Sequence, residues 1–258
     1  MTPNTDTEPN KLKVLYFDIE TAPINVLIWH VFGDYAGQDQ ILHDSFLLTW
    51  AAKWDGDSKV LSDRLTKQEV LAKDDARIVE SLARLLREAD VVVAHNGDKF
   101  DIPIVNKRLM LNDLDPLPPF TTIDTLKLAK RNFRMEMNKL DFIAERLGLG
   151  RKIKTEFMLW RDAYEGSVRA LKEMERYNKQ DVVLLEQVLD RMKPYVRRLT
   201  RLFDGPGFSC PWCGSTHLQK RGKHRSQVTT WQRWQCMECK KYPRSKTLLE
   251  VRHPLHPL

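Results

Sequence analysis

Three acidic stretches, far apart in this chain, constrain its fold more than any other feature. Asp18 and Glu20 end one apolar run, Asp101 follows another, and Asp181 lies four residues after Tyr177. Carboxylate oxygens of this kind suit Mg²⁺ or Mn²⁺ rather than zinc. A pair of such ions can activate water against a phosphodiester bond. If the five side chains converge in space, the pattern predicts a metal-dependent nuclease.

The local spacing of these residues is compatible with such a site. Residues i and i+2 of a strand point to the same face, so Asp18 and Glu20 could reach a shared metal ion. Tyr177 and Asp181 are four apart on a predicted helix and are therefore neighbours. Because a tyrosine has a reference pKa near 10, we expect Tyr177 to orient a water rather than act alone as a base. Each residue taken singly also has an ordinary structural explanation, and the ordered set is what favours a catalytic site.

The pattern of apolar residues predicts an α/β domain. Strands come first along the chain, and helices and a strand then alternate, which favours a mixed central sheet flanked by helices rather than a barrel. The predicted strands are 13–18, 24–31, 46–54, 60–61 and 90–94. The predicted helices begin at 74 and continue with 100–111, 125–131, 140–147, 168–177 and 182–195, the last two being joined if the helix is bent.

The positive charge of the chain lies wholly in its last fifth. The net charge is +7, yet residues 1–204 contain 32 Lys and Arg against 33 Asp and Glu. Residues 205–258 contain 10 Lys and Arg against 2 Asp and Glu. A compact basic segment beside a neutral body suggests a surface for phosphate backbones, although a solvated basic tail has the same composition.

All four cysteines lie in the same segment and form two Cys-x-x-Cys pairs. Cys210 and Cys213 are separated by 22 residues from Cys236 and Cys239. This spacing is typical of one structural zinc ion, and disulfides are the alternative. We therefore expect a disordered tail at 1–10, the main domain at 11–203, a zinc ribbon at 204–250 and a second tail at 251–258. The break is expected at Asp204-Gly205-Pro206-Gly207.

The acids belong to three longer motifs in a specific order. These motifs are Phe17-Asp18-Ile19-Glu20-Thr21, His95-Asn96-Gly97-Asp98-Lys99-Phe100-Asp101 and Tyr177-x-x-x-Asp181. They resemble the exonuclease motifs of the DEDD superfamily, in its tyrosine branch, which includes the proofreading domains of family B DNA polymerases and related stand-alone nucleases. The resemblance covers roughly residues 12–195. It implies a ribonuclease H-like fold and 3′-to-5′ exonuclease activity with two Mg²⁺ or Mn²⁺ ions.

The resemblance also implies roles for individual residues. Asp18, Glu20, Asp101 and Asp181 would ligate the metal ions, and Tyr177 would position the attacking water. Thr21, Asn96 and Phe100 would lie along the terminal nucleotide. We expect His95 to pack or hydrogen-bond, because the histidine branch of this family has its base where this chain has Tyr177. Asp98 and Asp124 are expected to support the structure or the metal-binding acids.

The predicted ribbon combines basic and aromatic residues. Trp231 and Arg233 would share one face of a strand at 228–234 and could contact unpaired bases and phosphates, so both are candidate substrate-binding residues. The alternative is that the tryptophans form the small core of the ribbon, and we expect one to be buried and the other exposed. The partner predicted for the whole chain is nucleic acid, most simply single-stranded DNA.

Other functions are left open by the sequence. An exoribonuclease of the same fold, or a non-catalytic docking module for replication or repair proteins, would share these features. Any editing would occur in trans to a polymerase or other replication protein, because the remaining length cannot hold a polymerase domain. No apolar run approaches the roughly 20 residues that span a bilayer, and residues 1–10 lack the pattern of a secretion signal. We therefore expect a cytoplasmic protein, or a viral one in host cytoplasm.

Overall fold

The chain divides into two compact units. The computed structural model describes residues 12–30, 36–150, 156–196, 199, 210, 212–225 and 229–251. One unit spans residues 13–191, and the other contains a separate three-stranded sheet. The break expected at 204–207 and the tail expected at 1–10 lie outside the described residues.

The larger unit is built on a five-stranded mixed sheet in the order β5-β4-β1-β6-β7. The pairings β1–β4 and β4–β5 are antiparallel, whereas β1–β6 and β6–β7 are parallel. This confirms the α/β class and the ribonuclease H-like mixed sheet. The strands are β1 (Val14–Thr21), β4 (Leu47–Trp54), β5 (Leu61–Arg64), β6 (Val91–Ala94) and β7 (Thr121–Asp124).

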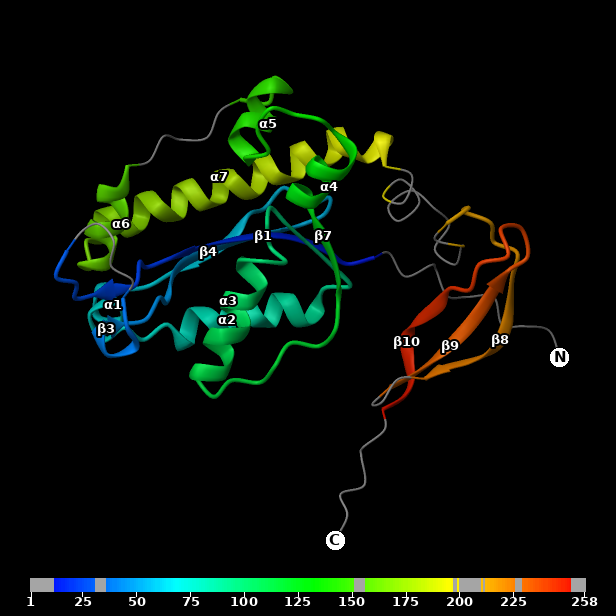
Figure 1. Cartoon of the computed structure of the whole chain (residues 1–258), viewed down its shortest axis with the longest axis horizontal. Coiled ribbons are helices and arrows are strands. Elements are labelled where there is room, and N and C mark those ends of the chain that lie inside the picture. The colour runs from blue at the N-terminus through cyan, green and yellow to red at the C-terminus, as the bar shows by residue number, and fades with distance from the viewer. Residues whose placement is uncertain are drawn as a thin grey trace, which may run out of the picture. The chain divides into compact units, whose positions relative to one another are not determined.

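Helices cover both faces of this sheet. Figure 1 shows α7 (Val168–Met192) on one side and α2 (Ala76–Glu88) and α3 (Asp101–Leu111) on the other. Side chains of β1 alternate between the two faces of the sheet. Leu15, Phe17 and Ile19 belong to the buried core that includes α2. The polar residues between them face α7, where Asp18 accepts a hydrogen bond from Asn178. The two helices predicted at 168–177 and 182–195 are one continuous helix, α7.

Smaller elements complete the unit. The expected strand at 24–31 is reduced to the two residues of β2, because its apolar side chains face solvent and its described pairing is only with the short β3. The strand β7 and the helices α1 and α6 are additional to the prediction. The smaller elements of this unit are β2 (Asn25–Val26), η1 (Gln38–Gln40), β3 (Ile41–His43), α1 (Lys67–Ala72), α4 (Thr125–Asn132), α5 (Leu140–Arg146) and α6 (Phe157–Tyr164). The short helix η2 (Lys193–Tyr195), which comes after α7 in the chain, belongs to the other unit.

The second unit contains an antiparallel sheet in the order β10-β9-β8. Its strands are β8 (Leu218–Arg225), β9 (Thr229–Cys236) and β10 (Arg244–Val251). The strand expected at 228–234 corresponds to β9. Trp231 and Trp234 are both half-buried, so the expected division into one core and one exposed tryptophan is wrong.

Candidate active site

Three of the four predicted metal-binding acids meet at one point. Carboxylate oxygens of Asp18, Glu20 and Asp181 all lie within 4.8 Å of one another. Asp18 and Glu20 come from β1, and Asp181 comes from α7, so the long helix brings its acid across the sheet to the strand. Asp181 is buried, whereas the two strand acids are half-buried. The cluster is therefore buried on the Asp181 side and accessible to solvent on the side of Asp18 and Glu20.

The pairing of β1 explains why its two acids can reach this cluster. Asp18 lies opposite Ala51, and Glu20 opposite Thr49, in the antiparallel ladder with β4. The register then shifts between Glu20 and Thr21, as it does at a β-bulge. Bulges increase the local twist and redirect side chains, and they are frequent beside active sites. Thr21, the residue after the shift, is half-buried at the end of the strand.

Asp101 lies beside the cluster rather than within the group of three. It is the first residue of α3 and is only 2% exposed. Its Oδ1 accepts a 3.3 Å hydrogen bond from the backbone N–H of Ile19, the residue between the two strand acids. The parallel pairing of β1 with β6 runs from Val14 to Tyr16, so at Ile19 a carboxylate takes the place of a strand partner. Asp101 is thus hydrogen-bonded to the backbone of the β1 segment that carries Asp18 and Glu20.

Tyr177 occupies the same face of α7 as Asp181, as the four-residue spacing predicts. Its side chain is largely buried, with 8% exposed. The ring meets Trp160 of α6 edge to face, with centroids 6.3 Å apart and an interplanar angle of 77°. Such pairs favour one ring orientation. The aromatic contact therefore favours one orientation of the Tyr177 ring on this face of α7.

Asn178 is a site residue that the sequence reasoning missed. It is fully buried and its Nδ2 donates a 2.6 Å hydrogen bond to Oδ2 of Asp18. Its Oδ1 accepts a 3.2 Å hydrogen bond from Oγ1 of Thr49 on β4. These two hydrogen bonds, from Thr49 to Asn178 and from Asn178 to Asp18, hold the Asp18 carboxylate in one orientation. The sequence indicates this residue only by its position between Tyr177 and Asp181, on a helix whose predicted site residues must face the sheet.

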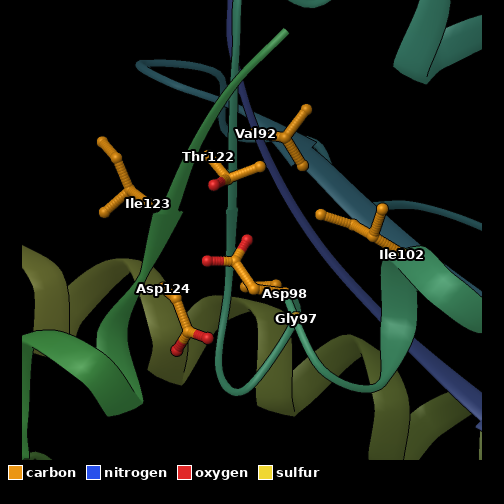
Figure 2. Close-up of a pocket in the computed structure, with 8 residues that line it drawn as sticks. Val92, Gly97, Asp98, Ile102, Thr122, Ile123 and Asp124 are labelled. Carbon is orange, nitrogen blue, oxygen red and sulfur yellow. The ribbon is translucent and has the colours of Figure 1, made fainter. Parts of the chain in front are cut away.

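The connection from β6 to α3 passes very close to the strand. Figure 2 shows Gly97 and Asp98 on this connection, near Asp124 at the end of β7. A Cβ at Gly97 would lie 2.4 Å from Cβ of Ala94, a distance that real side chains do not tolerate. Asn96 has a positive φ of 71°, which Asn adopts more readily than most residues. Glycine at 97 thus allows the tight path that leads to Asp101.

Asp124 secures this connection. Its Oδ1 accepts hydrogen bonds from the backbone N–H groups of Leu126 and Lys127, which caps α4, and from the N–H of Asn96. Asp98 forms an ion pair of 2.6 Å with Lys127. Both acids therefore have the supporting contacts expected of them. The small pocket of Figure 2 has no room for even a water molecule, so it is not a ligand site.

Of the remaining predicted residues, His95 is hydrogen-bonded within the protein and Phe100 is exposed. The ring nitrogens of His95 lie 2.8 Å from Oγ1 of Thr125 and 2.9 Å from the carbonyl oxygen of Asn138. Both nitrogens are engaged, as expected for a histidine that positions structure. Phe100 has 43% of its surface exposed at the start of α3, where it is accessible to a ligand.

The donor set of the acidic cluster fits hard divalent cations. Three carboxylates with mutually close oxygens are a costly arrangement without a compensating positive charge. Oxygen donors alone, without nitrogen or sulfur, match Mg²⁺ and Mn²⁺. Asp18, Glu20 and Asp181 could hold one ion between them, with Asp101 adjacent.

The four cysteines of the second unit form a second candidate metal site. Their sulfurs also lie within 4.8 Å of one another, and no disulfide joins them. The Sγ atoms of Cys210 and Cys239 are 3.5 Å apart, and those of Cys213 and Cys236 are 3.3 Å apart. A tetrahedral zinc site with Zn–S bonds of about 2.3 Å places sulfurs about 3.8 Å apart. The cluster therefore has nearly the dimensions of a Cys₄ zinc site.

The surroundings of the cysteines already favour thiolate at one position. Burial raises the pKa of the Cys210 thiol to about 12. Burial also acts to raise the pKa of Cys236, but hydrogen bonds from the backbone of Cys239, the Cys213 thiol and the backbone of Glu238 outweigh it and lower the pKa to about 6. The same backbone donors would stabilise a metal-bound thiolate.

Comparison with known proteins identifies the family of the larger unit. A family model for RNase_H_2, described as RNase_H superfamily, matches residues 15–193. Because the match covers more than half of the chain, this protein belongs to the RNase H superfamily. No curated protein sequence matches the chain significantly.

The fold is also similar to a solved structure. The family B DNA polymerase from the hyperthermophilic archaeon Pyrobaculum calidifontis aligns with a TM-score of 0.55 and 14% sequence identity. The similarity covers 86% of this chain and 32% of the polymerase, so the chain spans about a third of the length of that protein. At this identity the comparison shows a shared fold. Within the described part of the chain, each helix is too short or too polar to cross a membrane.

Proposed function

We propose that this protein is a metal-dependent 3′-to-5′ exonuclease of the tyrosine branch of the DEDD superfamily. Its substrate is the 3′ end of single-stranded or frayed DNA. The observation that carries the proposal is the convergence of Asp18, Glu20 and Asp181 within 4.8 Å in a fold of the RNase H superfamily. The fold is also similar to part of a family B DNA polymerase, a protein that acts on DNA, which supports the choice of DNA as the substrate.

The proposed chemistry distributes roles among residues of β1, α3 and α7. Asp18, Glu20, Asp101 and Asp181 would hold two Mg²⁺ or Mn²⁺ ions, which when bound activate water and relieve charge on the leaving oxygen. Tyr177 orients the attacking water, with its ring fixed by Trp160.

The residues around the acids provide the nucleotide site in this proposal. Thr21, Asn96 and Phe100 lie along the terminal nucleotide. Phe100 is exposed enough to contact a base, and Thr21 follows the bulge beside Glu20. The second unit, a zinc ribbon held by its four cysteines, increases affinity for nucleic acid. Its excess of Lys and Arg over acids supports that role.

Release of labelled nucleotides tests the proposal directly. DNA and RNA strands labelled at either end are incubated with and without added Mg²⁺, and no chelator is used so that zinc is retained. We expect immediate release of a 3′ label as mononucleotide, a descending ladder from a 5′ label, and a preference for DNA. Hydrolysis of RNA alone would make the enzyme an exoribonuclease instead.

Two variants connect the activity to the acidic cluster. Asp18→Ala and Asp181→Ala should each abolish release while the fold is kept, because each removes a carboxylate from the group of three. Asp57→Ala, which removes an exposed acid from a turn, is the matched control and should be fully active. Full activity of Asp18→Ala, or no Mg²⁺-dependent release by the unaltered chain, would contradict the proposal. The second result would favour a non-catalytic docking role.

A further inference from the structure

Three arginines of the zinc ribbon gather on one face of its sheet. Arg233 lies on β9, and Arg244 of β10 is its partner in the antiparallel register, so their side chains share a face. Arg221 of β8 reaches the same face, because its Nε donates a 2.9 Å hydrogen bond to Oε1 of Gln235, two residues beyond Arg233. We call Arg221, Arg233 and Arg244 the arginine face. All three residues are exposed.

The guanidinium groups of this face are held by aromatic rings and backbone. Arg244 lies over the ring of Trp231, with Cζ 4.1 Å from the centroid, and Arg233 lies over the ring of Tyr242 at 5.4 Å. Nε of Arg233 also donates a 2.9 Å hydrogen bond to the carbonyl oxygen of Arg221. Contacts of this kind restrict a flexible side chain before any ligand arrives, which reduces the entropy lost on binding.

The same pairing of cation and ring recurs elsewhere in the ribbon. Lys220 lies over Trp234 at 5.6 Å, and Lys241 lies over Trp212 at 5.5 Å. Trp231 contacts a second neighbour, His224, with centroids 5.6 Å apart. The ring expected to stack on an unpaired base is therefore already in contact with protein groups. The aromatic residues act here as supports for cations.

We propose that the arginine face binds the sugar–phosphate backbone of nucleic acid through these ring-supported cations and needs no unpaired base. A guanidinium matches a phosphate with two parallel N–H groups, which a base ring does not offer. Residues 205–258 contain 10 Lys and Arg against 2 acids, so little internal charge competes with phosphate. The ribbon then accepts duplex as well as single-stranded regions. This inference rests on the proposed function only in taking nucleic acid as the substrate.

Salt dependence of binding tests the role of the arginines. The full chain, with zinc retained and no added Mg²⁺, is titrated with fluorescent oligo-dT and with a duplex of the same length over a series of salt concentrations. Arg233→Gln and Arg244→Gln should each reduce the slope of log affinity against log salt by about 0.9 on duplex and about 0.7 on the single strand. Arg84→Gln, which removes an exposed cation from α2, is the control and should leave the slope unchanged.

Removal of a ring distinguishes support from stacking. Tyr242→Leu keeps every charge, so the slope should be unchanged while affinity falls about two- to fivefold on both ligands. A loss of tenfold or more on oligo-dT with none on the duplex would show base stacking and would overturn the inference. Unchanged slopes in both arginine variants would also overturn it. The zinc content of each variant is measured as a check on folding. Tyr242 and Arg244 are both exposed, so their replacement should not disturb the ribbon. If one variant loses its zinc, the other still tests the proposal.

The outcome is separable from that of the proposed function. The binding titration requires no hydrolysis, and the variants leave the acidic cluster intact. Mg²⁺-dependent hydrolysis together with unchanged arginine slopes would refute the arginine face alone. No hydrolysis together with the expected slopes would refute the exonuclease and keep the backbone-binding surface.

Discussion

The side-chain amide of Asn178 donates a 2.6 Å hydrogen bond to Asp18 across 160 positions of sequence. Thr49 orients this amide by donating a hydrogen bond to its oxygen, which leaves the NH₂ group directed at the carboxylate. α7 therefore supplies an acid to the cluster and also fixes the acid that β1 supplies. Loss of a group that orients a metal ligand typically lowers metal affinity or activity by about 10- to 100-fold.

Asn178→Leu should weaken Mn²⁺ binding by about 10- to 100-fold, because the Asp18 carboxylate loses the contact that orients it. Binding is measured by electron paramagnetic resonance on the full chain without nucleic acid. Asn112→Leu is the matched control, since Asn112 donates a comparable 2.8 Å hydrogen bond to Asp75, away from the cluster. That variant should lose stability but bind Mn²⁺ normally. Equal Mn²⁺ affinity in both variants would show that Asn178 is only structural.

Tyr177→Phe should slow nucleotide release by about 10- to 100-fold and leave Mn²⁺ affinity unchanged. The change removes only the hydroxyl group, so the edge-to-face contact with Trp160 and the packing remain. Misplacement of a reacting group by about 1 Å is enough for a loss of this size. Single-turnover rates at saturating Mg²⁺ give the measurement. An unchanged rate would exclude the phenol from the mechanism.

Much of this arrangement could be predicted from the sequence because it depends on local periodicity. The apolar run before Asp18 places this acid near the end of β1. The four-residue spacing from Tyr177 to Asp181 places both side chains on one face of α7. The short strand β7 could not be predicted in this way, because its four residues follow a proline-rich loop and, among the described residues, pair with β6 alone. The contact of Asn178 with Asp18 depends on the packing of α7 across the sheet.

Gly97→Ala should destabilise the larger unit by about 1–3 kcal/mol, because the new methyl group would lie 2.4 Å from Cβ of Ala94. The connection must then move, and Asp101 with it, so nucleotide release should also fall. Chemical denaturation and the release assay measure the two effects. The double variant Ala94→Gly with Gly97→Ala removes the clash and should recover part of both losses. Simple additivity would argue against this contact.

Cys236→Ser should remove the ribbon's zinc, because one of four thiolates is lost. Zinc content measured by a colorimetric chelator should fall from one ion per chain to near zero. The turnover of saturating short oligonucleotides should be retained, since the acidic cluster lies in the other unit. Affinity for long strands should decrease. Loss of turnover at saturation would mean that the ribbon contributes to the catalytic step.

Glu69→Gln should lower stability at neutral pH by about 0.5–1 kcal/mol. Hydrogen bonds from Arg77 hold the pKa of Glu69 at about 2, below its ordinary value of 4.5. A depressed pKa contributes stability that is present above pH 4.5 and is lost as the pH falls toward 2. The difference between the two proteins should therefore disappear over that window in denaturation curves. Glu88→Gln, which removes one member of an exposed ion pair with Lys13, is the control and should leave stability at neutral pH nearly unchanged.

The single helix α7 carries Tyr177, Asn178 and Asp181 on one turn and a fraction of the next. A residue inserted before Tyr177 would rotate all three side chains by about 100° relative to the N-terminal half of the helix. The phenol proposed to orient water, the amide that donates to Asp18 and the acid of the cluster would be lost from the site together. Insertions or deletions in the first half of this helix should consequently disrupt the acidic cluster far more than changes of the same length in the loops.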